Sequence, residues 1–136
     1  MKARFGFIGA GLLALSALAG QAGAQAIDGK AVFAANCAAC HQAGGTGIPG
    51  AFPALKGNKF VAGDGNLVIA TVLKGRGGMP TFAESIDDAN LAAVISYVRG
   101  AWGNTSGAVT AEQVAAVRNA SKAGDMIQKD QPTNVH

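Results

Sequence analysis

The chain has only two cysteines, and both lie in the short run Cys37-Ala-Ala-Cys40-His41. Four kinds of site are compatible with this run: a disulfide, a zinc site, a redox-active dithiol and a covalent haem attachment site. A disulfide across this span would close a very small loop and would stabilise the fold only slightly. Structural zinc needs four ligands, and the only other histidine is His136. A thioredoxin-type dithiol lies in a βαβ unit, and no stretch of the chain alternates convincingly enough to predict a strand.

A covalent haem fits the spacing for a geometric reason. Two cysteines one helical turn apart can each reach a vinyl group of the same porphyrin, and the adjacent histidine then projects its imidazole toward the iron. The run therefore predicts one haem c per chain, attached at Cys37 and Cys40, with His41 as an axial ligand.

A second axial ligand is expected from a methionine. After the N-terminal segment the chain has two, Met79 and Met126. A methionine is usually core filler, but Met79 lies in Gly77-Gly78-Met79-Pro80, which is a poor place for filler. The glycines allow the backbone to approach closely, and the proline stiffens the loop. Met79 is therefore the predicted ligand, and His/Met ligation raises the reduction potential, which suits an acceptor late in a respiratory chain.

Residues 1–24 have the layout of a secretory signal peptide. Lys2 and Arg4 precede an uncharged apolar stretch, and cleavage is expected after Ala24 or Ala26. The stretch is shorter than the about 20 residues that span a bilayer, so we expect a periplasmic protein without stable membrane insertion. Its removal lowers the formal net charge from +3 to +1 and leaves about 110 residues, enough for one domain. This low charge, without an aromatic platform, argues against nucleic-acid binding.

Capping residues and apolar periodicity predict a small all-α domain in which three to five helices and long loops wrap around the haem. The expected helices cover residues 28–35, 66–74, 88–100 and 111–118, with Asp28, Asp64, Asp87 and Thr110 at their starts. Residues 43–63 hold six glycines and two prolines and are expected to form a loop. The predicted division is a haem domain over residues 27–103 and an extension over residues 104–136, which ends in a short helix and a loose tail.

In their order along the chain, these features resemble the class I c-type cytochromes, which carry a single haem. The resemblance covers roughly residues 27–102 and is carried by the haem attachment run, the two terminal helices, Phe52-Pro53-Ala54-Leu55 and Gly78-Met79-Pro80. It implies the small cytochrome c fold. It also implies that the Pro53 carbonyl accepts a hydrogen bond from the Nδ1–H of His41, and that Leu55 packs on the haem.

The resemblance further implies a close crossing of the first and last helices of that domain. Gly29 and Phe33 on the first helix would pack against Val94 and Tyr97 on the last. Because Gly29 has no side chain, the two helix backbones could approach each other closely.

By this resemblance the protein is a monomeric electron carrier and not an enzyme. It would shuttle one electron at a time between a periplasmic dehydrogenase or quinol-oxidising complex and a terminal oxidase. Residues 96–104, continuing to residues 114–118, are similar to the cytochrome c subunits and domains that serve periplasmic dehydrogenases. The alternative is a haem-based sensor or catalyst with an open or labile sixth position, which no feature of the sequence excludes.

A set of positive residues flanks the Pro53 and Met79 loops. Its members are Lys56, Lys59, Lys74 and Arg76. They form either a positive rim that steers an acidic partner or a set of ordinary solvated charges.

Overall fold

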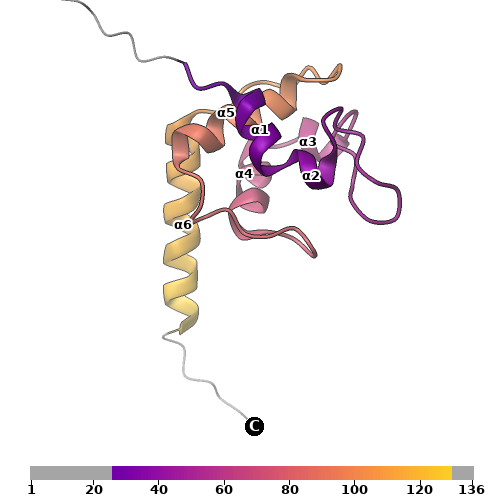
Figure 1. The fold of residues 1–136 in the computed structure, drawn as a ribbon. Coiled ribbons are helices and arrows are strands. Elements are labelled where there is room, and N and C mark those ends of the chain that lie inside the picture. Colours follow the sequence, from indigo (N-terminus) through magenta and orange to yellow (C-terminus); the bar gives the residue numbers. More distant parts are fainter. Residues whose placement is uncertain (1–25, 130–136) are drawn as a thin grey trace, which may run out of the picture.

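The computed structural model describes residues 26–129, with side chains as far as Asp125, so the expected signal peptide lies outside this part of the chain. The helices are α1 (Gly29–Asn36), α2 (Ala38–His41), α3 (Lys59–Ala62), α4 (Gly65–Lys74), α5 (Asp88–Gly100) and α6 (Ala111–Lys129) (Figure 1). No strand forms between residues 26 and 129, and the predicted all-α class is confirmed. The expected number of three to five helices is wrong, because the four-residue helices α2 and α3 bring the described total to six.

The longer helices begin at polar residues that satisfy their first backbone N–H groups. The Asp28 carboxylate accepts hydrogen bonds from two N–H groups of α1, Asp64 from one of α4 and Asp87 from one of α5. Thr110 and Gln113 form a capping box at the start of α6, with reciprocal side-chain to backbone hydrogen bonds of 2.8 and 3.2 Å. The helix starts predicted from these residues are therefore confirmed to within one residue.

Helices α1 and α5 cross at close range, as the resemblance implies (Figure 1). A Cβ atom at Gly29 would lie only 2.1 Å from the carbonyl oxygen of Ala93, so only glycine fits at this crossing. The rings of Phe33 and Tyr97 meet beside it with centroids 5.6 Å apart, and Val94 is buried. The crossing fixes α1, the helix that leads into the cysteine run.

The core lies between α1, α4, α5 and α6. Its fully buried side chains are Phe33, Ile69, Leu73, Leu91 and Val114. Helix α6 packs along α4 and α5, and its last turns extend beyond the other helices (Figure 1). The segment after residue 103 therefore contributes to the same core as the residues before it.

The expectation that the last helix ends near Arg118 is wrong, because α6 continues to Lys129. Residues 111–129 contain no proline and are rich in alanine and other good helix formers, and the buried Val114 anchors the helix to the core. The expected start of the loose tail, directly after Arg118, is therefore too early. Residues 130–136 lie outside the described part of the chain. Neither α6 nor any other helix within residues 26–129 is long and apolar enough to cross a membrane.

The expected loop over residues 43–63 contains one unpredicted element, helix α3. The side chain of Asn58 accepts hydrogen bonds from the backbone N–H groups of Phe60 and Val61, at 2.9 and 3.3 Å. Val61 is buried in the core. An N-cap and one buried side chain are therefore enough to hold a single helical turn among the glycines.

Candidate functional site

The cysteine run lies at the junction of two helices. Cys37 ends α1 and precedes α2, while Cys40 and His41 belong to α2. Both thiols are free and half-buried. Burial, with a further contribution from the neighbouring Cys40, raises the pKa of the Cys37 thiol to about 11. Redox-active dithiols depend on a lowered pKa, so the environment of Cys37 does not favour that interpretation of the run.

The imidazole of His41 is oriented by a backbone carbonyl. Its Nδ1 lies 2.9 Å from the carbonyl oxygen of Pro53, so the contact implied by the resemblance is present. A carbonyl oxygen can only accept, and Nδ1 must therefore carry the proton and donate it to this bond. The lone pair is then on Nε2, the nitrogen on the other side of the ring. This arrangement is the one found in metal-binding histidines, which donate their second N–H to a fixed acceptor.

The loop after His41 is held by its own backbone and by Trp102. The N–H of Gly47 donates to the His41 carbonyl at 3.0 Å, and the N–H of Leu55 donates to the Gly45 carbonyl at 2.8 Å. The Trp102 indole N–H donates to the Ala43 carbonyl at 3.2 Å. Its ring packs so closely on Gly45 that a Cβ atom there would lie 2.4 Å from it. Leu55 is half-buried against the core.

Asn104 ties the far end of the same loop to α5. Its side-chain oxygen accepts from the N–H of Gly57 at 2.8 Å, and its amide nitrogen donates to the carbonyls of Leu55 and Val98 at 3.1 and 2.8 Å. Trp102 and Asn104 were not identified from the sequence as supports of this loop, although a lone tryptophan followed by glycine and asparagine just after a helix is a recognisable turn pattern.

Met79 lies in the separate loop between α4 and α5. Arg76 and Met79 exchange two backbone hydrogen bonds, of 3.1 and 3.0 Å, around a two-residue turn at Gly77 and Gly78. Gly77 has a φ of 59°, which glycine adopts without strain. The Met79 side chain is half-buried. The guanidinium of Arg76 lies 5.7 Å from the ring centre of Phe60 on α3, which gives the turn a second support.

The structure therefore joins some of the predicted site residues directly and leaves one apart. His41 follows the two cysteines on α2 and contacts Pro53, and Leu55 belongs to the same loop. Met79 stands on its own loop, which extends to the same side of the helices as the His41 loop in Figure 1. The four residues of the expected positive rim, Lys56, Lys59, Lys74 and Arg76, are all exposed.

The available donor atoms fit a haem c better than a metal ion alone. Within the described residues, no group of three or more His, Cys, Asp or Glu side chains is placed to hold a metal ion. Two free thiols, a histidine with Nδ1 engaged and a methionine on a glycine turn are the groups that haem attachment and ligation use. Two apolar side chains near Pro53, those of Ile48 and Phe52, are 40% and 36% exposed. Apolar surface of this kind beside a histidine suits an apolar ring.

Comparison with known proteins agrees with this interpretation. A family profile described as "Cytochrome C oxidase, cbb3-type, subunit III" matches residues 24–98. A cytochrome c-552 of Thermus thermophilus is 38% identical over 128 residues, which cover 79% of this chain and 84% of that protein. Cytochrome c6 of Leptolyngbya boryana is 42% identical over 78 residues, covering 55% of this chain and 91% of that protein.

A further relative is a subunit of a larger enzyme. The cytochrome c subunit of alcohol dehydrogenase (quinone) from Gluconobacter oxydans is 33% identical over 109 residues, which cover 71% of this chain. The match spans only 23% of that subunit, so this chain corresponds to about a quarter of its length. The profile and the two full-length cytochromes together decide the assignment: the chain belongs to the cytochrome c family, whose members carry electrons on covalently bound haem c.

Proposed function

We propose that this protein is a periplasmic carrier of single electrons, with one haem c attached at Cys37 and Cys40 and with His41 and Met79 as the axial ligands. The observation that carries the proposal is the 2.9 Å contact between His41 Nδ1 and the Pro53 carbonyl. It leaves Nε2 as the only nitrogen of that ring able to bind iron. When bound, the haem supplies an iron that exchanges one electron.

The residues of the site hold the ligands in place while the charge of the iron changes. Pro53 keeps the His41 ring from rotating and raises the basicity of Nε2. The Met79 thioether is presented from a backbone fixed by the two hydrogen bonds between Arg76 and Met79, which close the turn at Gly77 and Gly78. A thioether favours reduced iron, so this ligand set gives a higher reduction potential than histidine alone. The site is thereby suited to passing electrons and not to binding a substrate at the iron.

The partners are proposed from the relatives. One relative is a cytochrome c subunit of a quinone-dependent alcohol dehydrogenase, and the family profile is named after a subunit of a terminal oxidase. We therefore expect the electron donor to be a periplasmic dehydrogenase or quinol-oxidising complex and the acceptor to be a terminal oxidase. The protein would work as a monomer without enzymatic activity of its own, after export directed by residues 1–24.

Replacement of Met79 tests the ligand set. In Met79→Ala we expect the oxidised protein to lose the methionine–iron charge-transfer band in the far red and the reduction potential to fall, because the thioether is gone. Met126→Ala, which removes the other methionine outside residues 1–24, is the matched control and should keep both properties. A wild-type protein that is high-spin when oxidised, and that binds cyanide or carbon monoxide at once, would contradict the proposal and favour a sensor or catalyst.

A further inference from the structure

The loop that carries Met79 is supported by α4 at the residues that follow the methionine. The hydroxyl of Thr81 donates to the Leu73 carbonyl, and the N–H of Phe82 donates to the Val72 carbonyl at 3.2 Å. The N–H of Ala83 in turn donates to the Thr81 hydroxyl at 3.3 Å. The residues just after Met79 are therefore linked both to α4 and to the second half of the loop.

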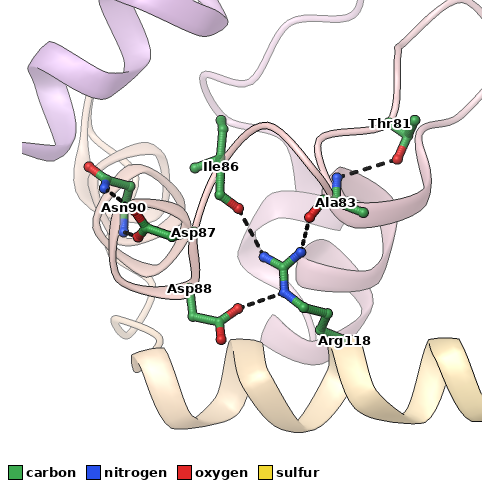
Figure 2. A network of polar contacts seen from close by, with 7 residues as sticks. All are labelled: Thr81, Ala83, Ile86, Asp87, Asp88, Asn90 and Arg118. Carbon is green, nitrogen blue, oxygen red and sulfur yellow. Dashed lines mark hydrogen bonds and ion pairs between the residues drawn. The ribbon is translucent and has the colours of Figure 1, made fainter.

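The second half of the loop is anchored by the buried side chain of Ile86 and is bound to α6 by three contacts from one side chain, that of Arg118 (Figure 2). Its Nε donates to Asp88 Oδ1 at 2.7 Å, its Nη1 donates to the Ala83 carbonyl, and its Nη2 donates to the Ile86 carbonyl at 2.9 Å. Every nitrogen of the guanidinium thus has a partner between residues 83 and 88. The planar, forked shape of arginine is what allows one side chain to bind three acceptors in this way.

Arg118 projects from a firmly held part of α6. Val114, one turn earlier on the same helix, is fully buried in the core, and the capping box at Thr110 and Gln113 fixes the start of the helix. The Arg118 side chain is only 13% exposed. Helix α6 also lies beyond residues 24–98, the part of the chain that the family profile matches. The tie between α6 and the Met79 loop therefore comes from outside the matched region.

A loop without such a tie would open more readily. The carbonyls of Ala83 and Ile86 would have to turn toward water if the guanidinium were removed, because buried carbonyls need donors. Ala83 is four residues from Met79 and is bonded to Thr81, two residues from Met79. Local opening of segments 83–88 would therefore loosen the residues that follow the methionine directly.

We propose that Arg118 is a positioning residue for Met79: by holding residues 83–88 against α6, it keeps the loop in the conformation that presents the thioether and slows its replacement by an external ligand. This inference rests on the proposed role of Met79 as an iron ligand. It assigns to the C-terminal helix a part in the behaviour of the haem site, in addition to its part in the core.

The test is the rate at which cyanide displaces the methionine in the oxidised, full-length holoprotein, followed by loss of the methionine–iron band. In Arg118→Ala we expect a rate roughly tenfold higher than in the wild type, because hydrogen bonds to a charged group are lost from the closed loop. Arg118→Lys should give a smaller increase, because one ammonium group cannot bind three acceptors in the same fork. Lys122→Ala, an exposed position one turn later on α6, is the charge-matched control and should stay within about twofold of the wild type.

Asn104→Ala distinguishes a specific effect of Arg118 on the Met79 loop from a general loss of stability. It removes a comparable set of hydrogen bonds from the His41 loop. If Arg118→Ala binds cyanide no faster than Asn104→Ala or the wild type, the inference is wrong even if its unfolding temperature falls. If the wild type shows no methionine–iron band at all, the ligand role of Met79 is wrong and the inference falls with it. If Arg118→Ala does not yield holoprotein, the test uses Arg118→Lys and Asp88→Asn, because each of these variants keeps part of the network. Cyanide-binding rates equal to that of the wild type in both variants would contradict the inference.

Discussion

The loop of His41 and the loop of Met79 are attached to the helices by different parts of the chain. The His41 loop is held by residues that directly follow α5, namely Trp102 and Asn104. The Met79 loop is held by α4 just after the methionine and by Arg118 of α6 at its end. The first loop is thus closed by the segment that directly follows α5, whereas the second depends on a helix that follows it by more than 20 residues along the chain.

The two loops also differ in what the attachment does. On the His41 side, the proposed ligand follows the cysteines on a helix, so its position is largely set before the loop is added. On the Met79 side, the proposed ligand directly follows a two-residue turn, and its position depends on the support around that turn. We therefore expect changes near His41 to act mainly on stability, and changes near Met79 to act mainly on ligand exchange.

The largest effect is expected where both loops share a support, at the crossing of α1 and α5. In Gly29→Ala the new Cβ atom would meet the Ala93 carbonyl at 2.1 Å and Tyr97 Cβ at 3.0 Å, so the helices would have to separate. We expect a loss of about 3 kcal/mol in the free energy of unfolding, measured by denaturant unfolding of the holoprotein. Gly124→Ala, on an exposed part of α6 with open space around it, should be neutral or slightly stabilising. Equal unfolding free energies for the wild type and Gly29→Ala would contradict the close crossing.

A smaller effect, confined to the His41 side, is expected for Asn104→Ala. The substitution removes hydrogen bonds to three backbone groups, at Gly57, Leu55 and Val98. We expect about 2 kcal/mol less stability in denaturant unfolding, while the rate of cyanide binding stays near that of the wild type. Asn119→Ala, at an exposed position of α6, is the matched control and should change neither quantity. A faster cyanide reaction in Asn104→Ala would show that the two loops are not independent.

Much of the helical framework could be predicted from the sequence because its determinants are local. Asp28, Asp87 and Thr110 act on N–H groups two or three residues away, so a helix start can be recognised without knowledge of the fold. Helix α3 was missed because its cap, Asn58, stands among glycines that normally indicate a loop. The length of α6 was underestimated because its polar composition resembles a tail, and only its packing shows why it is ordered.

In the candidate site, too, local features could be predicted from the sequence and contacts between distant segments could not. The spacing of the cysteine run is visible in the sequence, and the contact between His41 and Pro53 could be anticipated from the family resemblance. The roles of the two cysteines, His41, Met79 and Leu55 toward the haem all remain predictions. Arg118 could not have been placed, because its partners lie 30 to 35 residues earlier in the sequence and depend on where α6 packs. Its i, i+4 spacing from Val114 shows only that it faces the domain.

The smallest effect is expected at the end of the Met79 loop, where Asp87 caps α5. The backbone N–H and then the side chain of Asn90 donate to the carboxylate, at 2.8 and 2.7 Å, and they lower its pKa below the ordinary value of 3.8, with a lesser contribution from Arg118. The folded-state pKa is thus lower than that of the unfolded chain. The ionised carboxylate therefore stabilises the fold above its ordinary pKa, and this contribution is lost as the pH falls through the folded-state value.

Asp87→Asn separates the cap from the charge, because asparagine is an equally good N-cap that does not titrate. At about pH 7 we expect the urea midpoint of the variant to match that of the wild type, since the cap is kept. Between about pH 5 and pH 3 the wild type should lose more stability than the variant, because only the wild type must protonate this carboxylate. Asp125→Asn, at an exposed position of α6, should follow the wild type. If Asp87→Asn loses as much stability in acid as the wild type does, the charge of the Asp87 carboxylate does not stabilise the fold, and the side chain acts as a hydrogen-bond acceptor alone.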